Sequence, residues 1–251
     1  MNYNMKPLTL SLTTALLSIL LAVPHAHVIA QSVDPFSWDG QLVYNANRIQ
    51  ETKPTSRFVS DAATPIYIAV PSAMYLYGVT SSLIDQPTAD RRYMSETAVQ
   101  QFVTMGITYG VVLGLKMAID RERPYQAYPG LIINGEEGND KYFSSMPSGH
   151  AAGAAAFATT LSLRYPHWYV IVPSVGWALW TGYARMNLGV HFITDVLAGY
   201  ALGAGIAYGV HLLNHHIFKL ADPILPSSEQ AMSMGIIGTP YTPIFSFSTT
   251  F

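Results

Sequence analysis

The chain has 251 residues, enough for one sizeable domain or two small ones. Half of its residues are hydrophobic and only 11% are charged, well below the roughly 25% of an ordinary soluble domain, which favours a membrane protein. The net charge of -2 argues against a nucleic-acid-binding protein, and the absence of cysteine excludes disulfides and thiolate chemistry.

The first 30 residues have the features of a secretory signal peptide. Lys6 precedes an uncharged apolar run over residues 7–23, and Val28-Ile29-Ala30 resembles a cleavage site. The alternative is an uncleaved first membrane helix, because the run is close to the shortest that spans a bilayer. In either case we expect the next segment, residues 31–61, to be exported. It is predicted to contain an amphipathic helix near residues 40–52 and to act as a packing cap without chemistry.

Five apolar segments follow, and they predict an all-α protein: a bundle of five long helices, embedded in the membrane. Pro65 and Pro71 are expected to kink or shorten the first segment. Alanine and glycine in the third and fifth suit close helix packing. The helical bundle is assigned to residues 62–218, and residues 219–251 are expected to form a short irregular or β-like tail. The five segments are residues 62–84, 97–119, 151–163, 168–183 and 196–213.

Polar and charged residues form three clusters between these segments. If the chain after the signal lies outside the membrane, five spans place the connections that carry the clusters on one outer face. We therefore expect the clusters to meet. They are Lys116 with Arg123-Pro124, then Pro147-Ser148-Gly149-His150, then Arg185 with His191 and Asp195.

The cations in these clusters predict an anion site. Lys116 and Arg123 are seven residues apart, so on a helix they point the same way, and Arg185 adds a third cation. Three cations beside an apolar bundle are costly without an anion between them. Ser148 stands where a helix N-cap would, and Gly149 lets a ligand approach the backbone. The implied ligand is phosphate or a similar tetrahedral oxyanion.

The two histidines suggest hydrolysis in two steps. His191 and Asp195 are four residues apart, so on a helix the carboxylate can hold one imidazole nitrogen and leave the other to attack. His150 is then available to protonate the leaving oxygen. A structural histidine explains an isolated pair of this kind equally well. No metal or other cofactor is required, because the cations can neutralise the phosphoryl oxygens.

The order and spacing of the three clusters resemble the signature of the type 2 phosphatidic acid phosphatase superfamily, which includes lipid phosphate phosphatases, bacterial acid phosphatases and vanadium haloperoxidases. The resemblance implies that His191 is the nucleophile, that Asp195 orients it and that His150 is the general acid. The residues that it implies bind the phosphoryl group are Lys116, Arg123, Ser148, Gly149 and Arg185. Ala184 departs from the family, which usually has serine there.

The expected substrate is a phosphorylated membrane lipid of the phosphatidic acid, phosphatidylglycerol phosphate, undecaprenyl diphosphate or lipid A class. The expected location is the bacterial inner membrane, with the active site facing the periplasm. The alternatives are a soluble periplasmic acid phosphatase, a vanadium-dependent haloperoxidase and a non-catalytic phospholipid-binding membrane protein. The loop over residues 125–146 is a candidate lid, and Asp120, Arg121 and Glu122 are expected to be solvated or paired with one another.

Overall fold

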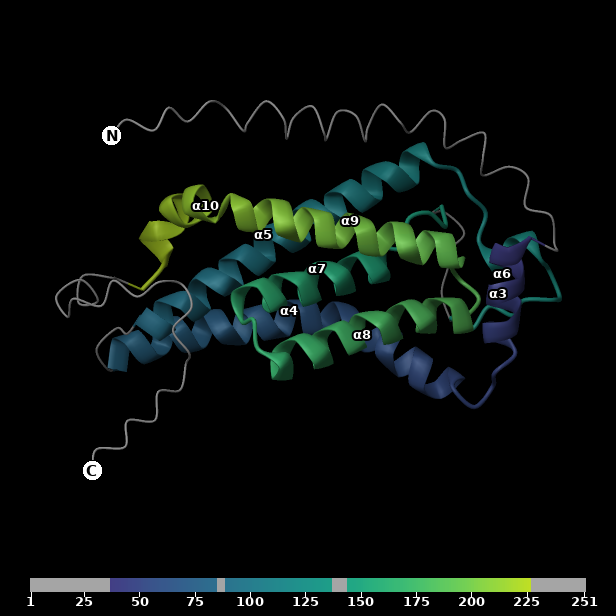
Figure 1. Cartoon of the computed structure of the whole chain (residues 1–251), viewed down its shortest axis with the longest axis horizontal. Helices are drawn as coiled ribbons and strands as arrows, with labels where there is room; N and C mark the ends of the chain where they lie inside the picture. Colours follow the sequence, from purple (N-terminus) through teal and green to yellow (C-terminus); the bar gives the residue numbers. More distant parts are fainter. Residues whose placement is uncertain (1–36, 85–88, 137–143, 227–251) are drawn as a thin grey trace.

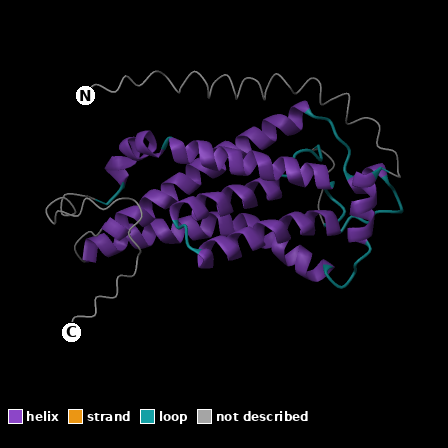
Figure 2. Cartoon of the chain, viewed as in Figure 1, coloured by secondary structure: helices purple, strands orange, loops and turns teal. Residues whose placement is uncertain are grey.

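The computed structural model describes residues 37–84, 89–136 and 144–226, and its regular elements are all helices (Figure 1; Figure 2). The predicted all-α class is confirmed for this part of the chain. The predicted signal peptide lies outside the described residues, as does the predicted tail beyond residue 226. The described start of that tail, residues 219–226, was expected to be irregular or β-like, but most of it is helical, in α10 and η2. The elements are α3 (Trp38–Asn47), α4 (Lys53–Ile84), α5 (Ala89–Ala118), α6 (Pro124–Ala127), α7 (Gly149–Arg164), α8 (Trp168–Asn187), α9 (Ile193–Leu212), α10 (Asn214–Ala221) and the 3-10 helix η2 (Asp222–Ile224).

Two long helices extend further than the hydrophobic pattern predicts. Helix α4 is a single helix of 32 residues that includes Pro65 and Pro71, so the expected shortening is wrong. Each proline removes one backbone donor, but α4 packs along α5 and α8, and tertiary packing maintains the helix. Helix α5 begins at Ala89, eight residues before the predicted segment 97–119, so Arg91 and Arg92 are also helical.

Helix α7 is the centre of the bundle and packs against α9, α8, α5 and α4 (Figure 1). Small residues allow this, because a helix of alanine and glycine lets its neighbours approach closely. A Cβ atom added at Gly199 of α9 would lie only 2.6 Å from the carbonyl oxygen of Ser148, and one at Gly203 would overlap the carbonyl group of Ala152. The two glycines therefore bring the start of α9 against the start of α7.

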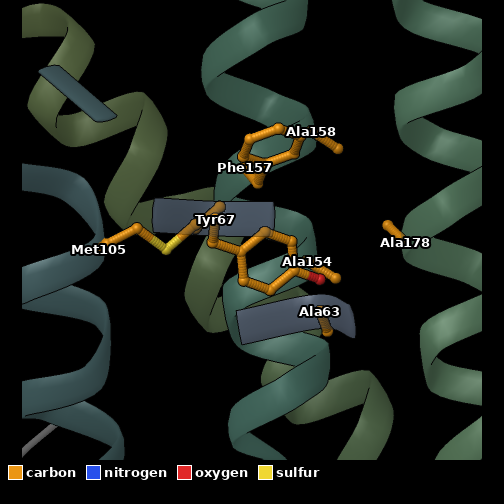
Figure 3. Packing of buried hydrophobic residues seen from close by; sticks show 8 residues of the cluster. Ala63, Tyr67, Met105, Ala154, Phe157, Ala158 and Ala178 are labelled. Carbon is orange, nitrogen blue, oxygen red and sulfur yellow. The ribbon is translucent and has the colours of Figure 1, made fainter. Parts of the chain in front are cut away.

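A buried cluster in the middle of the bundle joins α4, α5, α7 and α8. Figure 3 shows Tyr67 of α4 at its centre, with Met105 of α5 beside it and Ala154 and Phe157 of α7 close to its ring. The rings of Tyr67 and Phe157 are 5.2 Å apart, and Trp177 Nε1 donates a hydrogen bond of 3.2 Å to the Tyr67 hydroxyl. The hydroxyl of Tyr67 therefore has a hydrogen-bond partner although the side chain is buried.

The outside of the bundle is apolar. Two stretches, Asp90–Ala118 in α5 and Ile193–Leu212 in α9, are long and apolar enough to cross a membrane by length and composition. Exposed side chains on these helices and on α8 include Phe102, Ile107, Leu113, Val172, Leu179, Leu197, Tyr208 and Leu212. Apolar side chains exposed along several helices are typical of a surface that contacts lipid or another protein.

Candidate active site

The structure brings the three predicted clusters together at one end of the bundle. The C-terminal ends of α5 and α8 and the N-terminal ends of α7 and α9 meet there, beside α3 and α6 (Figure 1). Lys116 Nζ donates to the carbonyl oxygens of Ser144 and Ser145, just before the second cluster. The backbone N–H of Ser148 donates to the carbonyl oxygen of Asp195 (3.0 Å), which joins the second cluster to the third.

Asp195 organises the start of α9. As the third residue of the helix, it reaches back to accept a hydrogen bond from the backbone N–H of Phe192 (2.8 Å). The same oxygen, Oδ2, accepts a hydrogen bond from Ser145 Oγ (2.5 Å) and lies 3.6 Å from His191 Nδ1. That last distance exceeds a hydrogen bond, although catalytic contacts are often long before substrate binds. The carboxylate therefore faces Nδ1 and leaves Nε2 as the nitrogen available to attack.

His191 is buried among cations in the short loop between α8 and α9. The loop turns at Gly189, whose φ of +74° favours glycine. Only 2% of His191 is exposed. Burial, followed by the positive charges of Arg185, Lys116 and Arg123, lowers the pKa of His191 well below its usual value. The imidazole is therefore neutral near pH 7, as a nucleophile must be.

The cations come from separate elements. Lys116 ends α5, while Arg123 is the N-cap residue of the short helix α6. Arg123 is 4% exposed, and its Nη1 donates to the carbonyl oxygen of Val190 (3.4 Å), beside His191. Arg185 lies in the last turn of α8 and is 2% exposed. Two buried guanidinium groups and the half-buried Lys116 ammonium around one imidazole form an electrostatic site for an anion.

One of these cations already contacts a carboxylate. Glu136 accepts hydrogen bonds from both terminal nitrogens of Arg185, with Nη2 to Oε2 at 2.9 Å, and a third from Ser60 Oγ of α4 (3.0 Å). Burial by itself would raise the pKa of Glu136, but the Arg185 guanidinium lowers it to about 2. Glu136 is therefore ionised at all physiological pH values.

The start of α7 supplies the remaining predicted residues. Ser148 is the N-cap, and its hydroxyl accepts a hydrogen bond from the backbone N–H of Ala151 (3.4 Å). Gly149 and His150 are the first two residues of the helix, where backbone N–H groups point outward and attract anions. Burial, followed by the positive charge of Arg185, lowers the pKa of the His150 imidazole to about 3, although the charge of Glu136 acts in the opposite direction. Without a bound anion His150 is therefore neutral near pH 7.

Arg121 was expected to be solvated or paired with its neighbours, and that expectation is wrong. It is 8% exposed, and its Nη2 donates to Asp39 of α3 (2.7 Å) while its Nη1 donates to Asp195 Oδ1 (2.5 Å). Its backbone N–H donates to Ser144 Oγ (3.1 Å), so the chain turns inward after α5. In the sequence Asp39 is only part of a turn signal, Trp38-Asp39-Gly40, because its partner Arg121 lies 82 residues away. Ser60, Glu136 and Ser145 were also missed.

Comparison with known proteins places this arrangement in a family. The family model described as the PAP2 superfamily matches residues 97–219, which contain all three clusters. Two crystal structures share the fold. Aquifex aeolicus LpxE covers 72% of this chain and 99% of its own, with a TM-score of 0.57 and 20% identity. The first transmembrane PAP2 type phosphatidylglycerolphosphate phosphatase from Bacillus subtilis covers 80% and 96%, with a TM-score of 0.58 and 20% identity.

Curated relatives match over shorter stretches. Lipid A 1-phosphatase of Rhizobium etli is 31% identical over 146 residues, which are 57% of this chain and 62% of that protein. Lipid A 4'-phosphatase of Helicobacter pylori is 33% identical over 119 residues, 47% of this chain and 56% of that protein. The chain thus spans little more than half the length of these two relatives. The family model, the fold and the cluster spacing agree in relating residues 97–219 to the PAP2 superfamily, the type 2 phosphatidic acid phosphatases.

Proposed function

We propose that this protein is a phosphatase that removes phosphate from a phosphomonoester or diphosphate of a membrane lipid through a phosphohistidine at His191. The observation that carries the proposal is a buried imidazole whose Nδ1 faces the Asp195 carboxylate at 3.6 Å and which lies among three cations. Such a site combines a nucleophile with electrostatic stabilisation of a phosphoryl group.

In the first step, His191 Nε2 attacks phosphorus and the bond from phosphorus to the leaving oxygen breaks. The negative charge of the bound phosphoryl group favours the protonated form of His150, which transfers its proton to that oxygen, so the lipid leaves as an alcohol or a shorter phosphate. In the second step, His150 takes a proton from water, and the oxygen attacks phosphorus and breaks the P–N bond. Inorganic phosphate leaves, and both imidazoles return to their starting states.

The phosphoryl oxygens are bound by the predicted set of residues. Lys116, Arg123 and Arg185 neutralise the charge that develops in the transition state, and the N–H groups at the start of α7, with Ser148 and Gly149, add donors. Because guanidinium and ammonium groups provide this charge, the reaction is proposed to proceed without a metal ion.

A lipid substrate is supported by the surface of the bundle and by the relatives. The site lies at one end of helices whose outer faces are apolar, so a lipid headgroup at the membrane surface can reach it. The matched relatives are named as phosphatases of lipid A and as an undecaprenyl-diphosphatase. We propose that the substrate is lipid A, undecaprenyl diphosphate, phosphatidic acid or phosphatidylglycerol phosphate. We also propose that the protein lies in the bacterial inner membrane, with its active site facing the periplasm. Residues 1–30 serve as the export signal.

A phosphate-release panel tests this function with the full chain in detergent micelles. Lipid diphosphates, lipid monophosphates and a soluble aryl phosphate are compared, with His191→Ala as the inactive variant. We expect the lipids to be preferred and His191→Ala to release no phosphate while keeping its helical circular dichroism. A labelled phosphoenzyme that survives alkali but not acid identifies the phosphohistidine. Full activity of His191→Ala, or no release from any substrate, refutes the proposal.

A further inference from the structure

We propose that Asp39 and Arg121 are positioning residues of this site, which fix the Asp195 carboxylate and through it the His191 imidazole. The inference rests on the proposed nucleophilic role of His191. It assigns a function to α3, which precedes the residues matched by the family model and was expected to be a packing cap.

Hydrogen bonds join four side chains: Arg121, Asp39 and Thr194 form a closed ring, and Asp195 is attached to it through Arg121. Arg121 Nη2 donates to Asp39 Oδ2 (2.7 Å), and Arg121 Nη1 donates to both Asp195 Oδ1 (2.5 Å) and Thr194 Oγ1 (2.7 Å). The Thr194 hydroxyl in turn donates to Asp39 Oδ2 (2.7 Å), which closes the ring. The three charged members are at most 8% exposed. Buried hydrogen-bond networks of this kind restrict their members to one geometry.

The ring controls the orientation of the Asp195 carboxylate. Rotation about the last bond of an aspartate is soft, so something must fix the plane of its two oxygens. Arg121 holds Oδ1, which leaves Oδ2 for Ser145, the Phe192 N–H and the His191 imidazole. The Arg121 guanidinium also lies over the Phe192 ring, 4.1 Å from its centre, next to His191 in the chain. A shift of Arg121 therefore changes how Oδ2 faces Nδ1.

The ring also sets the charge that His191 experiences. Two carboxylates and one guanidinium leave one net negative charge on the Asp195 side of the imidazole. The groups that face His191 from the other elements are positive or titrate to positive, namely Lys116 of α5, Arg123 of α6, His150 of α7 and Arg185 of α8. Without Asp39, the Arg121 charge would act on Asp195 alone and weaken its hold on a positively charged imidazole.

Two substitutions in the ring should therefore shift the pH profile in opposite directions. Asp39→Asn removes a negative charge and moves the acid limb of kcat/KM to lower pH, because His191 becomes harder to protonate. Arg121→Gln removes a positive charge and moves the same limb to higher pH. A merely structural role predicts lower yield or stability for both variants, but no shifts of opposite sign.

The test uses the full chain in detergent micelles with the preferred lipid phosphate. For Asp39→Asn we expect kcat to fall roughly tenfold, the scale of other outer-shell partners of a reacting histidine, with KM within about twofold. Asp39→Glu restores the charge and should recover part of kcat. Asp90→Asn, an exposed acid at the N-terminal end of α5, is the matched control and should behave as wild type.

The inference is overturned if Asp39→Asn has the same kcat and pH profile as wild type. It is also overturned if the acid limbs of Asp39→Asn and Arg121→Gln shift in the same direction. Should Asp39→Asn fail to fold, Asp39→Glu and Arg121→Lys provide the comparison; unchanged kcat in both overturns the inference as well. His191→Ala in the same series separates the two proposals. An active His191→Ala removes the proposed function, whereas an inactive His191→Ala beside a wild-type-like Asp39→Asn removes only the positioning role.

Discussion

Replacing Glu136 by glutamine should make the site bind phosphate more tightly. In the structure the Glu136 carboxylate accepts two hydrogen bonds from Arg185, so a phosphoryl group that uses this guanidinium must displace it. A hydrogen bond to a charged group contributes about 1.5–3 kcal/mol, against about 1 kcal/mol for a neutral one. The glutamine oxygen can still accept from the guanidinium but carries no charge, so the competition weakens by about 1.5 kcal/mol, which is roughly a tenfold change in affinity.

The assay is product inhibition. Lipid product is separated and quantified while inorganic phosphate is added, and the inhibition constants of wild type and Glu136→Gln are compared. We expect the constant to fall about tenfold in the variant. Because the pKa of Glu136 is lowered to about 2, its charge is present above that pH and is lost only as the pH falls through it. The ratio of the two constants should therefore stay the same between about pH 5 and 8.

Glu51→Gln is the matched control, because Glu51 is exposed in the turn before α4. Its inhibition constant should equal that of wild type. Equal constants for wild type and Glu136→Gln would refute the displacement argument. So would a ratio that falls toward one as the pH approaches 5, since the carboxylate would then be losing its charge far above the expected pKa.

Three further predictions concern packing, pH and metal ions. Gly199→Ala should destabilise the protein by about 1–3 kcal/mol and reduce phosphate release, because its Cβ would meet the Ser148 carbonyl. The control is Gly205→Ala, whose Cβ meets nothing within 4 Å: it should leave activity unchanged and should not lower the unfolding temperature. Since burial and cations lower the pKa of His191, the acid limb of kcat/KM for wild type should lie below about 6.5, and a limb above that value contradicts the neutral imidazole. Excess EDTA should leave phosphate release unchanged, because three cations neutralise the phosphoryl oxygens, and a loss restored by added metal would contradict this.

The parts of the site that could be predicted share one property: the chemistry of each lies in a short stretch of sequence. His191 and Asp195 are four residues apart, and α9 begins between them with Asp195 in its first turn. The cap at Ser148 is likewise a local signal for the start of α7. Counting the apolar segments was enough to predict that these stretches lie on the same side of the bundle. Helix ends on one side of a bundle are neighbours, so the stretches were expected to meet.

The parts that were missed depend on pairing across long separations. Arg121 reads as one charge in a run of charges, and only the fold shows that it turns inward to Asp39. Glu136 sits in a loop with no periodic pattern, and its partner Arg185 is 49 residues away. The N-terminal ends of α4 and α5 were also predicted incorrectly, for a different reason. Packing maintained a helix through Pro65 and through the polar start of α5, and hydropathy alone does not report packing.

The residues at this end of the bundle come from two separate parts of the chain, one of which is α3. Both histidines and the three cations come from the stretch that the superfamily shares, whereas the acid that balances Arg121 comes from a separate helix of ten residues. Exchanging that helix between superfamily members would retune the working pH of an otherwise unaltered reaction centre. A chain trimmed to residues 97–219 would keep every signature residue and yet lose both that acid and Ser60, which holds Arg185.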